Sequence, residues 1–207
     1  MRPLACRVHS AVLFASAIVI SACDDPVYFG VQTSVRGSGQ DASQSNTKLR
    51  IFITKTTFNG DLRTAGKSSD GLTAADALCQ LSADTLSLGG TFRAYIGTKT
   101  VNAIDRVPAV GPWTTLPTAF GSSTVNDAKS MGLAIDNLTT ETGDVTAHPY
   151  WSGAGLGGVS TGKDCDAWTH AGDGINGHYG SSTSGFTGDT SDQSCSWSAA
   201  LLCFEIR

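Results

Sequence analysis

Leu49-Arg50-Ile51-Phe52-Ile53-Thr54 is rich in β-branched and aromatic residues and alternates in the manner of a β-strand, and Asn59-Gly60 supplies a turn soon after it. Near the other end of the chain, Leu201-Leu202-Cys203-Phe204-Glu205-Ile206 has the same character and predicts the last strand. Because terminal strands of this kind usually pair at the centre of a sheet, we expect these two stretches to form the middle of the domain.

A main helix is predicted over about residues 72–88. Asp70-Gly71-Leu72-Thr73 opens it, Thr73 and Asp76 have the spacing of a weakened capping box, and Gly89-Gly90 ends it. Its apolar residues fall close to one face, which comprises Leu72, Ala75, Leu78, Cys79 and Leu86. Cys79 is therefore expected to face the core. A further strand is predicted over residues 92–97.

The composition excludes several classes of partner. The chain has 14 Lys and Arg residues against 18 Asp and Glu, and the basic residues form no cluster. Because nucleic acids and anionic membranes require a basic stripe, we predict no nucleic-acid partner. The low charged fraction of 15% and the 24 glycines are typical of loop-rich extracellular domains, so the domain should consist mostly of strands and long loops.

The N-terminus has the three-part layout of a secretory signal peptide over residues 1–22. Arg2 and Arg7 precede an apolar run over residues 11–20, which is shorter than the roughly 20 residues that a membrane-spanning helix needs. The segment that follows the apolar run, Ile20-Ser21-Ala22-Cys23, resembles the lipobox of bacterial lipoproteins. That resemblance implies that Cys23 is lipidated and anchors the mature chain, whereas ordinary signal cleavage would leave Cys23 a free thiol.

The predicted location is the cell envelope, with the domain in the periplasm or at the cell surface. Asp24 and Asp25 resemble a signal that retains lipoproteins in the inner membrane, but the rule differs between bacterial groups and leaves the choice of membrane open. A polar, Gly- and Ser-containing stretch makes residues 23–47 a flexible linker. Residues 48–207 then have the length of one domain.

Four cysteines remain in the predicted domain: Cys79, Cys165, Cys195 and Cys203. An exported protein with an even number of cysteines is expected to form disulfides, here with three possible pairings. The helix-face position of Cys79 and the strand position of Cys203 favour Cys79–Cys203, which leaves Cys165–Cys195. No pair has the short spacing of zinc ligands.

Several short motifs occur in an order that resembles a known family. They are Arg50-Ile51-Phe52-Ile53-Thr54, Ala74-Ala75-Asp76-Ala77-Leu78-Cys79-Gln80, Ala103-Ile104-Asp105-Arg106-Val107, Gly111-Pro112-Trp113, Tyr150-Trp151-Ser152-Gly153, Cys165-Asp166-Ala167-Trp168 and Leu202-Cys203-Phe204-Glu205. Together they resemble the leptospiral endostatin-like lipoprotein domain, and the order of cysteines, helix and long loops resembles a C-type lectin-like domain. The resemblance implies an α+β fold and surface lipoproteins that bind extracellular-matrix proteins and complement regulators.

The long-loop region offers few candidates for a metal site. The calcium-binding triplets of sugar-binding C-type lectins are missing, since Thr190-Ser191-Asp192 keeps only the aspartate. The loop aspartates are Asp164, Asp166, Asp173, Asp189 and Asp192, and we expect them to be solvated, although Asp189 and Asp192 remain ligand candidates. His148, His170 and His178 lack zinc-ligand spacing. We predict no metal and no cofactor.

The tryptophans are the main candidates for core or ligand contacts. Trp151 and Trp168 flank a stretch with eleven glycines over residues 153–188, so either ring could anchor a ligand, although core packing is favoured for both. Trp197 is expected in the core. The sequence has no Gly-x-Ser-x-Gly motif, and we predict that the protein is not an enzyme.

The sequence thus favours a lipid-anchored, non-enzymatic, adhesion-type module that binds a protein or glycan through the loops between Trp151 and Cys195. The alternatives are a structural envelope lipoprotein and an enzyme of unknown type.

Overall fold

A computed structural model of the 207-residue chain describes residues 48–108, 110–118, 122–127, 138–145, 148–181 and 191–207. The predicted signal peptide, Cys23 and the linker lie outside the described residues, as does Asp189. Within the described ranges, no helix combines the length and the apolar content needed to cross a bilayer.

The two terminal strands pair at the centre of the sheet, as predicted. β1 (Leu49–Ile53) runs antiparallel to β8 (Ala200–Ile206), and the strand order is β4-β3-β1-β8-β5-β6-β7. Successive residues of β1 do not alternate between core and solvent, because Ile51, Phe52 and Ile53 are all completely buried. This pattern indicates a central strand that is covered on both faces.

The sheet is mixed. Its other strands are β2 (Thr91–Ala94), β3 (Val110–Thr115), β4 (Thr124–Asp127), β5 (Pro149–Trp151), β6 (Asn176–Ser181) and β7 (Ser191–Ser194). β3 pairs parallel with β1 and β5 pairs parallel with β8, whereas the remaining pairs are antiparallel. The predicted α+β class and the predominance of antiparallel pairs are confirmed.

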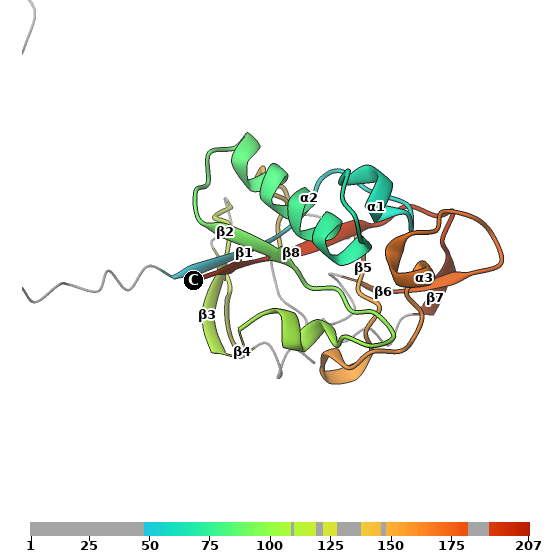
Figure 1. The fold of residues 1–207 in the computed structure, drawn as a ribbon. Coiled ribbons are helices and arrows are strands. Elements are labelled where there is room, and N and C mark those ends of the chain that lie inside the picture. The colour runs from blue at the N-terminus through green and yellow to red at the C-terminus, as the bar shows by residue number, and fades with distance from the viewer. Residues whose placement is uncertain (1–47, 109, 119–121, 128–137, 146–147, 182–190) are drawn as a thin grey trace, which may run out of the picture. The chain divides into compact units, whose positions relative to one another are not determined.

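The predicted main helix is α2 (Gly71–Thr85), and α1 (Leu62–Ala65) packs beside it (Figure 1). The prediction of its cap was wrong, because Asp70 is the N-cap and its carboxylate accepts the Thr73 N–H at 2.9 Å. The Asp76 carboxylate does not cap the helix and accepts a hydrogen bond from Arg106 instead. Leu86 follows the helix and is 40% exposed rather than part of the apolar face. The remaining helical turns are α3 (Cys165–Trp168), η1 (Ala103–Arg106) and η2 (Leu156–Gly158).

Two apolar clusters bury the two faces of the sheet. Ile51, Ile53 and Phe204 belong to one cluster, whereas Phe52 and Leu201 belong to the other. Alternate residues of each central strand therefore contribute to opposite faces, as strand geometry requires. α2 covers the second cluster, in which its residues Ala75, Leu78 and Cys79 are buried.

A disulfide joins α2 to the central strand. Cys79 and Cys203 are bonded with a Cα–Cα distance of 5.6 Å, and both are completely buried. Cys165 and Cys195 form the second bond. Both predicted pairings are confirmed, and Cys79 faces the core as its helical position indicated.

Candidate functional site

Trp197 lies in a turn between β7 and β8, next to the second disulfide. Its backbone N–H donates to the Ser194 carbonyl oxygen at 2.9 Å. Cys195, two residues before Trp197, forms a disulfide with Cys165 and donates its N–H to the Ile175 carbonyl oxygen at 3.0 Å. After the turn, the Ala199 N–H donates to the Phe58 carbonyl oxygen at 2.9 Å, so the backbone on both sides of the turn is tied to neighbouring segments.

The ring of Trp197 belongs to a row of four aromatic side chains. Ring centroids are 5.6 Å apart for Trp168 and Trp151, 5.7 Å for Trp151 and Trp197, and 5.3 Å for Trp197 and Tyr179. The last two contacts are edge-to-face, an arrangement that aromatic quadrupoles favour. The row begins in the core and ends at the surface, where Trp197 is 36% exposed and Tyr179 is half-buried.

The structure confirms the core position that was favoured for Trp151 and Trp168 and corrects the one expected for Trp197. Trp151 and Trp168 are completely buried, and their indole N–H groups donate to the carbonyl oxygens of Phe58 and Gly97, each at 2.7 Å. Packing and hydrogen bonding account for both rings, so neither is presented to a ligand. Trp197, which we expected in the core, is the exposed member, because its turn precedes the buried part of β8.

A carboxylate from the segment before β6 binds the turn that carries Trp197. Asp173 Oδ1 accepts hydrogen bonds from Ser194 Oγ at 2.8 Å and from Ser196 Oγ at 2.6 Å. These bonds lower the pKa of the fully exposed Asp173, so its carboxylate is ionised at neutral pH. We define the Trp197 surface as Trp197 and Tyr179, whose rings are in contact.

Asp192, a predicted ligand candidate, is paired within the domain. His178 Nδ1 lies 2.9 Å from Asp192 Oδ1, and Lys163 Nζ lies 3.9 Å from Asp192 Oδ2. His178 and Asp192 are partners in the β6–β7 ladder, as are Tyr179 and Ser191. Because successive residues of a strand point to opposite faces, Asp192 lies on the face away from Tyr179.

The loop aspartates do not converge on one point. Asp164 accepts the Lys99 backbone N–H at 2.7 Å, while Asp173 and Asp192 have the separate partners given above. Among the described residues, no three His, Cys, Asp or Glu side chains are placed to hold a metal ion together. Asp189 lies outside those residues.

The Cys165–Cys195 bond secures an unusual left-handed turn. The four residues of α3 have positive φ angles of 49°, 55°, 55° and 63°, a conformation that costs roughly 1–2 kcal/mol for each residue other than glycine. Trp168 ends the turn and is fixed by its complete burial and its bond to Gly97. Beside it, a Cβ added at Gly177 of β6 would lie 2.7 Å from Cys165 Sγ and 2.9 Å from Trp151 Cζ3. Glycine at position 177 therefore lets β6 approach the disulfide and the tryptophan row.

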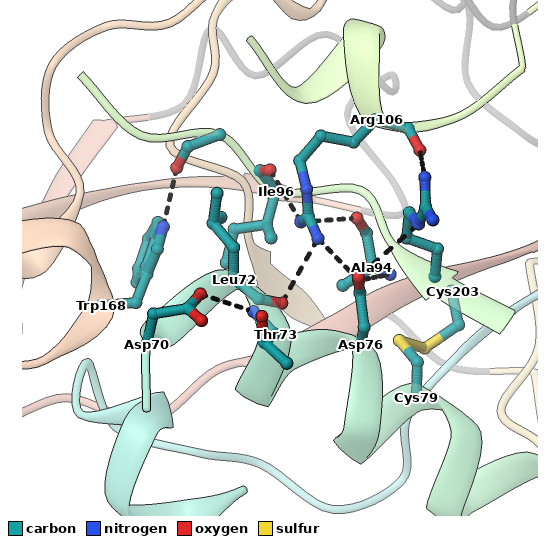
Figure 2. Close-up of polar contacts among 12 residues, drawn as sticks. Asp70, Leu72, Thr73, Asp76, Cys79, Ala94, Ile96, Arg106, Trp168 and Cys203 are labelled. Atoms are coloured by element: carbon teal, nitrogen blue, oxygen red, sulfur yellow. Dashed lines mark hydrogen bonds and ion pairs between the residues drawn. A yellow bond between two sulfur atoms is a disulfide. The ribbon is translucent and has the colours of Figure 1, made fainter. Parts of the chain in front are cut away.

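A second polar cluster is buried between η1, α2 and β2, and its role is structural. Figure 2 shows Arg106 reaching toward Asp76, whose Oδ1 accepts from Arg106 Nη2 at 2.7 Å, and toward the carbonyl oxygens of Ala94 and Ile96, each 3.1 Å from Nη1. Burial raises the pKa of Asp76 and lowers that of Arg106, and each charge opposes the shift of the other. The Arg106 side chain is 9% exposed, so this pair joins segments and does not face a ligand.

The Trp197 surface can contact and hydrogen-bond a ligand. It offers aromatic rings for packing and the indole N–H of Trp197 as a donor. Sequence reasoning had included Asp173 only among the solvated aspartates and had missed Ser194 and Ser196, which carry no motif. The one available signal was the position of Trp197 just after a cysteine and before the apolar run of β8.

No protein-family model matches the chain, and no curated protein matches it either. The class of protein is therefore defined by its geometry, as an α+β domain with a mixed sheet, two disulfides and an exposed aromatic turn.

Proposed function

We propose that this chain is a lipid-anchored, non-enzymatic binding module that contacts a protein or glycan ligand through the Trp197 surface. The observation that carries the proposal is the position of Trp197: a large aromatic ring, 36% exposed, that two other aromatic rings hold in place. Trp and Tyr are enriched among the residues that dominate binding energy. A ring that is already held in place loses little conformational entropy when it binds.

We also propose that the domain has a C-type lectin-like or endostatin-like architecture. Three features support this: the terminal strands pair centrally, a disulfide joins the main helix to the last strand, and the second disulfide closes the long-loop region. In such a domain the loops between Trp151 and Cys195 present the ligand-binding surface. The Trp197 surface borders those loops, since Tyr179 lies between Trp151 and Cys195 in the sequence.

The first expected result concerns Trp197. Full-length protein in detergent is screened against an array of defined oligosaccharides and a panel of immobilised extracellular proteins, and every ligand found is titrated. Trp197→Ala should weaken binding by about 30-fold or more, the effect of losing an aromatic hot spot. Leu81→Ala, at a 62% exposed position on α2, should leave affinity unchanged. Thermal unfolding of both variants reports whether the fold survives.

Equal affinities of the wild type and a folded Trp197→Ala variant, for every ligand found, would remove the Trp197 surface from the binding site. A ligand lost only on substitution of Lys163 or His178 would place the site on the opposite face of the β6–β7 hairpin. A partner found only by crosslinking within the envelope would favour the structural alternative.

The second expected result concerns the anchor. Cys23→Ser should move the protein from the membrane fraction to the soluble fraction and abolish labelling by radioactive palmitate, because two or three acyl chains supply the membrane affinity. The disulfides of the released domain should form normally, since neither involves Cys23. Substitution of Ser21 by Thr, which keeps a small residue before the cleavage site, serves as the control. A Cys23→Ser protein that stays in the membrane fraction would refute the anchor.

A further inference from the structure

The two Asn-Gly dipeptides of the chain lie against the second disulfide. They are Asn59-Gly60, which follows β1, and Asn176-Gly177, which begins β6. A Cβ added at Gly60 would lie 2.5 Å from Cys165 Sγ, and one added at Gly177 would lie 2.7 Å from the same atom. Two segments that are far apart in the sequence therefore meet at one sulfur atom, and each meets it with the glycine of an Asn-Gly pair.

Asn-Gly is the dipeptide in which a side-chain amide reacts most readily with the main chain, because glycine has no Cβ to hinder the approach. The backbone nitrogen of the glycine loses its proton to water and attacks Cγ of the asparagine. A C–N bond forms, the bond from Cγ to the amide nitrogen breaks, and that nitrogen takes up a proton and leaves as ammonia. Water then opens the resulting five-membered succinimide to aspartate or isoaspartate. The reaction thus requires only water and a glycine nitrogen that is free to move.

The backbone nitrogen of Gly60 is not free to move. Its N–H donates to the Cys195 carbonyl oxygen at 2.8 Å. The neighbouring Asn59 Oδ1 accepts the Asp61 N–H at 3.1 Å, so the side-chain amide has a partner as well. Gly60 is buried, whereas Asn59 is half-buried and within reach of water. Ring closure at Asn59 therefore requires the bond between Gly60 and Cys195 to open.

Gly177 is held by the sheet. It is buried within β6, opposite Gln193 of β7 on one side and bridged to Asp164 on the other. Asn176 before it is exposed, so its amide is open to water. An extended strand must bend for the glycine nitrogen to reach the asparagine Cγ, and that bend breaks the pairing on both sides. Ring closure at Asn176 therefore also requires local opening.

We propose that Asn59 and Asn176 are sites of deamidation through a succinimide, and that the Cys165–Cys195 disulfide keeps both unreactive. Cys195 carries the carbonyl oxygen that binds the Gly60 N–H, and Cys165 Sγ abuts both glycines. Loss of the bond frees both segments in one local opening. Isoaspartate at position 59 adds a carbon to the main chain where Gly60 lacks room for a single Cβ, so the product displaces the backbone from the sulfur atom.

The test compares full-length wild type, Cys165→Ala/Cys195→Ala and Arg106→Met in one mildly alkaline buffer in which circular dichroism shows all three to be folded. Peptide mass spectrometry follows the conversion of amide to acid, and isoaspartyl methyltransferase labels the isoaspartate. We expect the disulfide variant to react at least about tenfold faster than the wild type at both Asn59 and Asn176. Arg106→Met should react at close to the wild-type rate, because it loses a similar unfolding free energy but keeps the disulfide.

Equal rates in the two variants would assign the protection to global stability and overturn the proposal. Wild-type rates close to those of the urea-unfolded protein would overturn it too. Amide hydrogen exchange of the wild type supplies a measurement that needs no variant. The N–H groups of Gly60 and Gly177 should exchange slowly and at similar rates, because one opening exposes both. Rapid exchange of either group would contradict the proposed protection.

Discussion

Replacing Cys79 and Cys203 together by alanine is expected to lower the free energy of unfolding by about 5 kcal/mol. The bond links positions 124 residues apart, and the chain-entropy model assigns the larger stabilisation to the longer closed loop. Both cysteines are buried where α2 meets the sheet, and Cys203 pairs with Phe52 on one side and Ala94 on the other. The loss should appear as a lower midpoint of urea-induced unfolding.

The matched control is the double replacement of Cys165 and Cys195, whose separation is 30 residues. The same model predicts a loss of between about 3 and 4 kcal/mol for that pair. Near-ultraviolet circular dichroism should also change more in this variant, because the second bond lies beside the row of tryptophans. A larger loss from the shorter loop than from the longer one would contradict the entropic account of these bonds.

Arg106→Met is expected to destabilise the protein by about 3–5 kcal/mol, the range found when one partner of a buried ion pair is removed. The guanidinium donates to Asp76 and to the carbonyl oxygens of Ala94, Ile96 and Leu72, so its removal leaves a partly buried carboxylate without its main counter-charge. Methionine keeps much of the apolar volume. Urea-induced unfolding of the purified variant measures the effect.

Arg93→Met supplies the comparison, because Arg93 contacts the same carboxylate from a more exposed position. Its Nε lies 3.6 Å from Asp76 Oδ2 and its side chain is 44% exposed, so the expected cost is at most about 1 kcal/mol. Combining Arg106→Met with Asp76→Asn should cost less than the sum of the two single replacements, since the second removes the uncompensated charge. Similar losses of unfolding free energy for Arg93→Met and Arg106→Met would show that burial of the Arg106–Asp76 pair does not determine its contribution to stability.

Local patterns were sufficient for the central elements of the fold. The apolar runs of β1 and β8, the helical spacing in α2 and the positions of Cys79 and Cys203 are properties of neighbouring residues. For that reason they predicted the strands, the helix and, with the even number of cysteines, both disulfides. Local patterns failed at the start of α2, where Asp70 and Thr73 both have side chains suited to capping and only the backbone geometry selects Asp70.

The candidate site depended on contacts between distant segments. Periodicity does not show whether Trp151, Trp168 or Trp197 is buried, because Phe58 and Gly97, which bond the first two, come from elsewhere in the chain. The same holds for the aspartates. Asp192 lies within ion-pair distance of His178 and Lys163, whereas Asp173 accepts from Ser194 and Ser196, and no motif distinguishes the two.

The sequence by itself therefore determined the class of fold, the central pair of strands, the main helix and the pairing of the cysteines, since each follows from short-range periodicity or from a small set of alternatives. Tertiary structure alone decided which tryptophan reaches the surface, which loop aspartate lies beside basic side chains and which two pairs of strands are parallel. Those features depend on contacts between segments that are far apart in the sequence. Burial and ion pairing are set by such contacts and cannot be inferred from one segment alone.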